Sequence, residues 1–483
     1  MTPESFRRKM DDFTQERSGS VAILFALACV GVFLSVGLAL DYSRAESMKG
    51  VLNTATDAAA LAALSAAQSD YAANLSVGQM MSDAQAAAHQ AFIANAGTDY
   101  SNLTRPPTIT VTRTGQVINA NVSYQAQSPN LFGALAGSAN MSVSHSGAAS
   151  LTLASYLNFY LLLDVSASMG IPSTASEINR LATINPDYLN LYPGGCTIAC
   201  HFTAYNACQN VKGQTVACQG YNLTRTAGNA NNTPVSYCPQ PGTSACIQLR
   251  LDAVAYATQL LIQTAISRQN ADHLPNQFGI GLYPFVRWMQ PYQPLTTNLS
   301  TVNASAAGLT GLIDNGYGSN TKTVANGAAV SIGLGSGGTH FENALPAINN
   351  VITTIGDGAS AASPRPFVFL VTDGAQDSQY QQNNGSWTGS NHATTLDTTN
   401  CTAIKNRGVT LAVLYVPYVP IPNPTTIWND EDHFANANIP KIPPALQSCA
   451  SPGFYFEASS PAEINNAMIA MFNMAVQTAH LTH

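Results

Sequence analysis

The hydrophobic pattern of the chain opens with one uninterrupted apolar run, Val21–Leu40. At a rise of about 1.5 Å per residue, a helix of this length covers about 30 Å, the thickness of the hydrocarbon core of a bilayer. Four basic residues precede the run and two follow it before position 105 (Arg7, Arg8, Lys9 and Arg17; Arg44 and Lys49). This bias predicts a single-pass membrane helix at residues 21–40, a cytoplasmic tail at residues 1–20 and an exported remainder.

A cleaved signal peptide is the alternative interpretation of this run. Gly37-Leu38-Ala39 offers a cleavage site of small residues. The apolar core of a signal peptide has about 7–15 residues, however, and this run is longer. Its length therefore favours a retained anchor.

Two different patterns follow the apolar run. Residues 41–97 are rich in alanine and predict a helix that continues the membrane helix outward or packs closely against a partner. Residues 98–154 alternate with a period of two and predict three short strands, Thr108–Thr112, Val117–Tyr124 and Met141–Gly147. The order of anchor, helical continuation and small sheet is a pilin-like α+β layout.

From residue 155 to about residue 480, strands and helices alternate. Strands are expected at Phe159–Asp164, Phe278–Phe285, Phe367–Gly374 and Thr410–Val416, and helices at Leu249–Ile266, Phe341–Ile355 and from Pro461 to about Gln477. Ser460 and Glu463 form a capping box at the start of the last helix. The alternation predicts an α/β domain with a doubly wound, mostly parallel sheet, in which ligands bind beyond the carboxyl ends of the strands.

Cysteine usage agrees with an exported domain. Cys29 lies in the apolar run, and eight cysteines follow it, six of them inside a cysteine-rich insertion at residues 172–248 (Cys196, Cys200, Cys208, Cys218, Cys238 and Cys246). We expect these six to pair among themselves and Cys401 to pair with Cys449. A zinc site is the alternative; Cys196-x3-Cys200-His201 comes nearest to one, but no second half follows at zinc-site spacing.

The composition narrows the possible partners. Charged residues make up only 9% of the chain and the net charge is −7, without a dense basic run. This pattern argues against nucleic-acid binding.

Five oxygen-bearing side chains lie where they could form one site. Asp164, Ser166 and Ser168 follow the first strand of the α/β domain, Thr339 precedes a helix and Asp373 ends a later strand. Carboxylate and hydroxyl oxygens are the ligands preferred by Mg²⁺, Ca²⁺ and Mn²⁺. The sequence therefore predicts a divalent-metal site, with at least one position left for water or for a carboxylate from a partner.

These five residues, in the segments LLLDVSASM, SGGTHFENAL and FLVTDG, resemble the metal-ion-dependent adhesion site of von Willebrand factor A domains. The resemblance implies that Ser166, Ser168 and Thr339 ligate an ion, usually Mg²⁺, directly. It implies that Asp164 and Asp373 act directly or through water, and that the ion recruits an acidic side chain of a partner. The long insertion after the first strand and the bulky His340 depart from the family pattern.

Residues 17–67 are similar to the N-terminal segment of TadG-like proteins of the tight-adherence (Flp) pilus system. The resemblance implies a bacterial inner-membrane protein with an anchor, an alanine-rich segment and an exported A-type domain. Leu24 stands where a prepilin cleavage motif would place a glutamate, which argues against processing by that route.

Other signals are weaker. Gly333-x-Gly335-x-x-Gly338 has dinucleotide-binding spacing, but only a poor strand precedes it, and the glycines suit a loop that presents Thr339. The run Asp430-Glu431-Asp432 lacks the ligand spacing of a calcium loop and predicts a solvated turn.

Three functions are therefore compared. The first is a non-enzymatic pilus assembly or adhesion component that binds a protein partner through the metal, without nucleotide. The second is a metal-independent scaffold of the pilus or secretion machinery. The third, an exported hydrolase, has no supporting motif, because neither Ser166 nor Ser168 lies in a nucleophile elbow.

Overall fold

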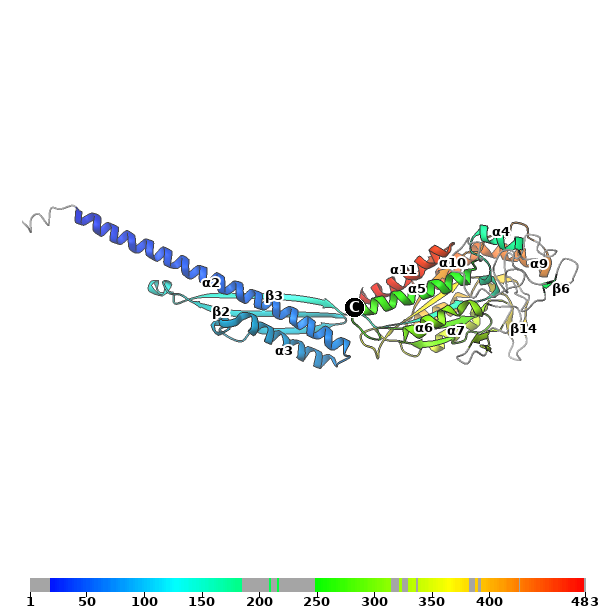
Figure 1. Cartoon of the computed structure of the whole chain (residues 1–483), viewed down its shortest axis with the longest axis horizontal. Coiled ribbons are helices and arrows are strands. Elements are labelled where there is room, and N and C mark those ends of the chain that lie inside the picture. Colours follow the sequence, from blue (N-terminus) through cyan, green and yellow to red (C-terminus); the bar gives the residue numbers. More distant parts are fainter. Residues whose placement is uncertain are drawn as a thin grey trace, which may run out of the picture. The chain divides into compact units, whose positions relative to one another are not determined.

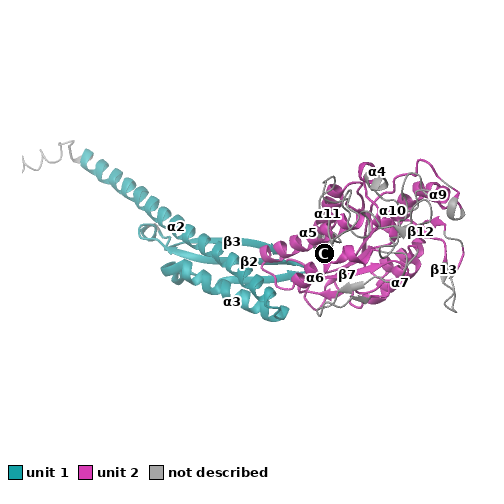
Figure 2. Cartoon of the chain, turned by 45° about the vertical axis from the view of Figure 1, so that its right-hand side comes forward, with its two compact units in different colours: residues 1–153 teal, residues 154–483 magenta. Residues whose placement is uncertain are grey.

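The computed structural model describes residues 18–184, 208–209, 215–216, 248–313, 321–323, 329–335, 338–381, 387–389, 392–424 and 426–481. The chain divides into two compact units, residues 1–153 and residues 154–483 (Figure 2). Unit 1 contains both the predicted alanine-rich segment and the predicted strand-rich region. Unit 2 begins one residue before the start expected for the α/β domain.

Unit 1 is built on one long helix, α2 (Ser18–Ala72), of 55 residues (Figure 1). Among the described residues it is the one helix long and apolar enough to cross a membrane. Only 6% of the most apolar stretch of this helix is buried. The core helix of a soluble protein would be mostly buried, so this exposure agrees with the predicted anchor at Val21–Leu40.

The rest of unit 1 comprises α3 (Val77–Ala96), the 3₁₀ helices η1 (Gly97–Asn102) and η2 (Gly133–Ala136), and strands β1 (Thr108–Thr114), β2 (Val117–Pro129) and β3 (Asn140–Thr152). The strands form one antiparallel sheet in the order β1-β2-β3, which confirms all three predicted strands. The predicted alanine-rich helical segment at 41–97 consists of the second part of α2 and of α3, with a short break at residues 73–76. Asn74 adopts a left-handed conformation, and the Ser76 hydroxyl caps α3 by accepting a hydrogen bond from the Gln79 amide.

Small side chains form much of the core of unit 1. On α3 the buried residues recur every fourth position, at Met80, Ala84, Ala88, Phe92 and Ala96. Residues of this spacing share one face of a helix. Six buried residues of α2 are also alanines, which explains how the alanine-rich sequence packs closely on its neighbours.

Unit 2 contains a six-stranded sheet in the order β17-β16-β11-β4-β7-β8. Its strands are β4 (Leu157–Asp164), β7 (Phe278–Phe285), β8 (Gln293–Thr296), β11 (Arg365–Thr372), β16 (Thr410–Tyr415) and β17 (Tyr455–Glu457). All pairs are parallel except the edge pair β7–β8. When the six strands are numbered 1 to 6 by their order in the chain and read across the sheet from β8, they follow the 3-2-1-4-5-6 order of doubly wound folds. The switch point lies between β4 and β11. The predicted fold class is confirmed.

Helices cover both faces of this sheet (Figure 1). Helices α5 (Arg250–Ala271), α6 (Leu299–Ala307) and α11 (Pro461–Leu481) pack on one face, and α7 (Phe341–Val351), α8 (Thr398–Asn406) and α10 (Ile442–Cys449) on the other. The alternation of side chains along β4 divides its residues between the two cores: Phe159 and Leu161 belong to the first, and Tyr160 and Leu162 to the second.

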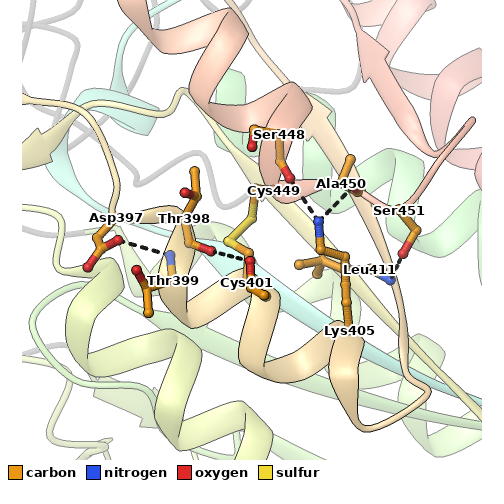
Figure 3. The surroundings of a disulfide bond; sticks show 11 residues. Asp397, Thr398, Thr399, Cys401, Lys405, Leu411, Ser448, Cys449, Ala450 and Ser451 are labelled. Atoms are coloured by element: carbon orange, nitrogen blue, oxygen red, sulfur yellow. Dashed lines mark hydrogen bonds between the residues drawn. A yellow bond between two sulfur atoms is a disulfide. The ribbon is translucent and has the colours of Figure 1, made fainter.

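The predicted disulfide between Cys401 and Cys449 is confirmed and joins α8 to α10 (Figure 3). Both cysteines are fully buried. The expected pairing of the six cysteines of the insertion, and the alternative zinc site at Cys196, Cys200 and His201, fall outside the side chains that the structure describes.

The remaining described elements are short. They comprise the helices η3 (Ala167–Gly170), α4 (Ala175–Ile184), η4 (Leu309–Leu312), α9 (Ile427–Asn438) and η5 (Ile439–Lys441). The other short elements are four two-stranded sheets: β5 (Cys208–Gln209) with β6 (Thr215–Val216), β9 (Thr321–Thr323) with β10 (Ala329–Ser331), β12 (Gln376–Asp377) with β15 (Ala393–Thr394), and β13 (Tyr380–Gln381) with β14 (Trp387–Thr388).

Candidate functional site

Two of the predicted metal-binding residues lie at the switch point of the sheet. Asp164 ends β4, and Asp373 follows directly after β11. The two strands are parallel neighbours, with Leu163 opposite Val371. Both carboxylates therefore reach the carboxyl edge of the sheet, where doubly wound folds bind ligands. Both aspartates are fully buried.

The loop after β4 brings its three oxygen-bearing side chains together. Oδ1 of Asp164 accepts a hydrogen bond from the Ser166 amide at 3.0 Å. The hydroxyls of Ser166 and Ser168 lie 3.0 Å apart, and both residues are buried. The loop thus presents one carboxylate and two converging hydroxyls, as the sequence predicts.

Thr372 ties this loop to the end of β11. Its hydroxyl donates to Oδ2 of Asp164 at 2.7 Å and accepts a hydrogen bond from the Gly374 amide at 2.9 Å. Thr372 was not among the predicted site residues, although it immediately precedes Asp373. The Thr-Asp-Gly sequence at the end of an apolar strand was the available signal.

The loop that carries Thr339 is hydrogen-bonded at the carboxyl edge of the sheet to the segments that follow β11 and β7. The carbonyl of Thr339 accepts a hydrogen bond from the Asp377 amide at 3.0 Å, four residues after Asp373. The amide of His340 donates to the carbonyl of Val286 at 3.0 Å, and Val286 directly follows β7. Since β7 pairs with β4 up to Asp164, the backbone of the Thr339 loop lies at the same sheet edge as the other four residues.

Gly338 permits this placement of the loop. Its φ is +94°, and a Cβ at this position would overlap the carboxylate of Asp377. Only glycine combines such a backbone conformation with so close a contact. Gly333 and Gly335 also have positive φ, and the carbonyl of Leu334 accepts hydrogen bonds from the Arg287 and Trp288 amides. The three glycines therefore shape the loop before Thr339, as expected, and β10 before them pairs antiparallel with β9.

A buried arginine also reaches the site, and sequence analysis missed it. Nη1 of Arg250 donates to the Ser168 carbonyl at 3.1 Å and lies 3.5 Å from Oδ2 of Asp373. Nη2 donates to the Pro417 carbonyl at 2.9 Å, and the guanidinium lies over the Tyr418 ring at 4.8 Å. Arg250 thus connects the loops that follow β4, β11 and β16. It begins α5, and nothing local in the sequence indicates how far its side chain reaches.

The electrostatics of the site follow from two buried carboxylates held close together. Burial and the negative charge of Asp373 raise the pKa of Asp164 to about 7. Burial also raises the pKa of Asp373, while the positive charge of Arg250 opposes the rise. Burial raises the pKa of the Tyr418 hydroxyl well above its usual value, and the charge of Asp373 adds to this effect. A further cation beside the two carboxylates would relieve their mutual repulsion.

The donor set fits a divalent cation. Oδ1 of Asp373 is buried and accepts no hydrogen bond of ordinary geometry from any residue that the structure describes, although the Ser168 and Tyr418 hydroxyls lie close enough to this carboxyl group to lower its pKa. Such an oxygen is costly unless it has a partner, and a metal ion would supply one. The five residues offer two carboxylates and three hydroxyls, all hard oxygen ligands. Within the described ranges, no group of three or more His, Cys, Asp or Glu residues forms a metal site of the ordinary kind.

An acidic group borders the site beyond Thr339. Nδ1 of the buried His340 lies 2.6 Å from Oε1 of Glu342, whose other oxygen accepts a hydrogen bond from Gln376. Burial raises the pKa of Glu431 to about 7, and the negative charges of Asp377 and Asp432 contribute to the rise. The expectation of a solvated turn at 430–432 was wrong, because these residues belong to α9 and Asp432 is buried.

Comparison with known protein families gives one match. Residues 19–73 match the Tad family model, which is described as Flp pilus-assembly TadE/G-like. This match covers the apolar run and most of α2. No curated protein matches the chain.

Several solved structures show a distant likeness. The pilus adhesin SpaC from Lactobacillus rhamnosus GG is 12% identical, with a TM-score of 0.31 over 77% of this chain. This chain covers only 34% of the SpaC chain. The PilB minor pilin from Streptococcus sanguinis is 9% identical, with a TM-score of 0.34 over 78% of this chain and 79% of PilB.

The vWF domain of the type V pili tip protein Mfa5 from Porphyromonas gingivalis is 10% identical, with a TM-score of 0.31 over 68% of this chain and 97% of that one. At such identities and TM-scores, these likenesses carry no argument about the function or the site of this chain.

Proposed function

Starting from the match of residues 19–73 to the TadE/G-like family, we propose that the chain is a membrane-anchored component of Flp pilus assembly or adhesion. Its anchor lies in the bacterial inner membrane, with the N-terminus in the cytoplasm and both units exported. Unit 2 binds a divalent cation and, through it, a protein partner. The role is one of binding rather than catalysis.

The family match is the observation that carries the pilus part of the proposal. The exposed apolar N-terminal part of α2 supports the anchor, and the basic residues that precede the run support its orientation. The buried disulfide between Cys401 and Cys449 supports export, because disulfides persist in oxidising compartments.

The metal part of the proposal rests on the buried oxygen Oδ1 of Asp373 and on the converging hydroxyls of Ser166 and Ser168. These groups, with the Thr339 hydroxyl, would hold the ion. Both oxygens of Asp164 already accept protein hydrogen bonds, so Asp164 orients the loop and binds through its remaining lone pairs or through water. Bound Mg²⁺ supplies a positive charge to which a carboxylate of a partner can bind.

Substitution of Asp373 tests the metal site. We expect Asp373→Asn to abolish Mg²⁺ and Mn²⁺ binding in isothermal titration calorimetry, and to reduce pilus assembly or adhesion. Asp397→Asn is the matched control: Asp397 is an exposed helix cap in the same unit, and asparagine caps as well as aspartate. Metal binding that survives Asp373→Asn would refute the proposed site.

A metal-independent scaffold remains the second candidate, and the ion pair between Arg250 and Asp373 favours it. Arg250 already places a positive charge beside Asp373, with both side chains fully buried. If the positive charge of Arg250 takes the place of a metal ion, Ser166→Ala leaves pilus assembly and adhesion unchanged. If the metal acts, the same variant loses both metal binding and adhesion.

A further inference from the structure

The turn between β2 and β3 in unit 1 is apolar, exposed and fixed to α2 at one level of that helix. Its exposed apolar side chains are Leu131 at 63%, Phe132 at 37% and Leu135 at 78% of full exposure. The twelve residues from Pro129 to Asn140 include no charged side chain. A short loop with three exposed large apolar side chains and no charge suits an apolar surface better than water.

Asp41 holds this turn against α2. Its carboxylate accepts hydrogen bonds from three consecutive amides, those of Leu131 and Phe132 at 2.9 Å and that of Gly133 at 2.7 Å. Asp41 is the first residue after the apolar run and is itself buried. The turn therefore lies beside α2 at the level where the predicted membrane span ends. Figure 1 shows this turn as the loop that joins β2 and β3.

Phe132 contacts the span itself. A Cβ at Gly37 would overlap the ring of Phe132, so the ring lies against the bare backbone of α2 at this position. Gly37 is four residues inside the span from Asp41, a distance of about 6 Å along the helix axis. The apolar surface of the turn is thus continuous with the last turn of the membrane helix.

The backbone of the turn is also suited to a region poor in water. Besides the three amides bound to Asp41, those of Asn130, Leu135, Gly137 and Ser138 donate to backbone carbonyls. The side chain of Asn130 donates to the Ser138 carbonyl at 3.0 Å. Backbone groups must be satisfied internally wherever lipid replaces water, and most amides of this turn meet that condition.

We propose that the β2–β3 turn inserts Leu131, Phe132 and Leu135 into the lipid leaflet on the exported side of the membrane. This inference rests on the membrane anchor of the proposed function. The turn gives unit 1 a second contact with the bilayer, and Asp41 fixes the depth of that contact relative to the span. Tyr42, which is exposed next to Asp41, lies at the level where aromatic side chains favour the membrane interface.

Tryptophan quenching by brominated lipids tests the insertion on the full chain reconstituted in bilayers. Leu135→Trp and Leu131→Trp change exposed positions and leave the packing of unit 1 intact. Phe33→Trp reports the depth of the span, and Leu75→Trp, in the exposed connection between α2 and α3, reports the aqueous end of unit 1. Leu75 is more than about 45 Å from Asp41 along α2. Quenching is measured as the change relative to the wild-type chain, whose three tryptophans lie in unit 2.

We expect lipids brominated near the headgroup to quench Leu135→Trp and Leu131→Trp, lipids brominated near the chain end to quench Phe33→Trp, and neither to quench Leu75→Trp. Quenching of Phe33→Trp without quenching at positions 131 and 135 would overturn the insertion and leave the anchor intact. Absence of quenching at Phe33→Trp would refute the anchor itself. Equal quenching at Leu75→Trp would show that unit 1 lies flat on the membrane, and would also overturn the proposal.

Discussion

At the scale of single residues, the site depends on charges buried beside one another. Asp164 and Asp373 could be predicted from the sequence, because Asp164 ends an apolar strand and Asp373 directly follows one, each in a recognisable motif. Arg250 could not, because its contacts come from three loops that only the tertiary fold brings together. A long side chain at a helix start gives no local sign of the groups it will reach.

Removal of Arg250 is expected to expose the repulsion between the two aspartates. Breaking a buried ion pair typically costs about 3–5 kcal/mol, so Arg250→Met should lower the free energy of unfolding of unit 2 by about that amount. Mg²⁺ should then raise the melting temperature of Arg250→Met more than that of the wild type. Arg268→Met is the control, because the half-exposed Arg268, on the same helix, pairs with the C-cap residue Asp272 and its loss should change stability by less than about 1 kcal/mol.

Equal destabilisation by Arg250→Met and Arg268→Met would contradict the structural role of Arg250. An unchanged response to Mg²⁺ in Arg250→Met would contradict the view that guanidinium and metal act on the same carboxylates.

The raised pKa of Glu431, in the acidic group that borders the site, predicts a pH dependence of stability. Its pKa is raised from 4.5 to about 7 in the folded chain, so the folded state holds a proton that the unfolded state releases at lower pH. The stabilisation by this proton is complete below pH 4.5 and is lost as the pH rises to about 7. Glu431→Gln should therefore stabilise the chain at pH 8 by up to about 3 kcal/mol and have little effect at pH 4.

Chemical denaturation of both forms at the two pH values measures this difference. A stability gap between wild type and Glu431→Gln that does not change with pH would show that Glu431 titrates as an exposed carboxylate.

At the scale of elements, strongly patterned segments were predicted well. Strand β7 occupies the predicted Phe278–Phe285, and the capping box is present: the Ser460 hydroxyl accepts from the Glu463 amide, and Glu463 accepts from the Ser460 amide. Short elements were missed. Strand β8 contains Pro294, which is tolerated because β8 is an edge strand, and α10 begins with prolines at residues 443 and 444. In these segments tertiary packing outweighs local pattern.

The disulfide between α8 and α10 is expected to contribute strongly to the stability of unit 2. It closes a loop with a sequence separation of 48 residues. For a loop of this length, chain-entropy arguments give about 4 kcal/mol of stabilisation. Replacing Cys401 and Cys449 together by alanine should therefore lower the denaturant midpoint of unit 2 markedly. Cys29→Ser, in α2, serves as the control, and equal midpoints in the two variants would contradict the prediction.

At the scale of the whole molecule, the two units have separate tasks in this account. Unit 1 contains the segment that matches the TadE/G-like family model, including the apolar N-terminal part of α2. Unit 2 contains the candidate metal residues, Arg250 and a hydrophobic core on each face of its sheet. Because the donor groups all belong to one unit with its own cores, we expect metal binding to be a property of unit 2 alone.

A crystal structure of the exported chain grown with Mn²⁺ would locate the bound ion. We expect an anomalous difference peak at the carboxyl edge of the sheet, within coordination distance of Ser166, Ser168, Thr339 and Oδ1 of Asp373. A peak elsewhere, or a site filled only by Arg250 with Oδ1 of Asp373 bound to protein, would contradict the proposed metal site.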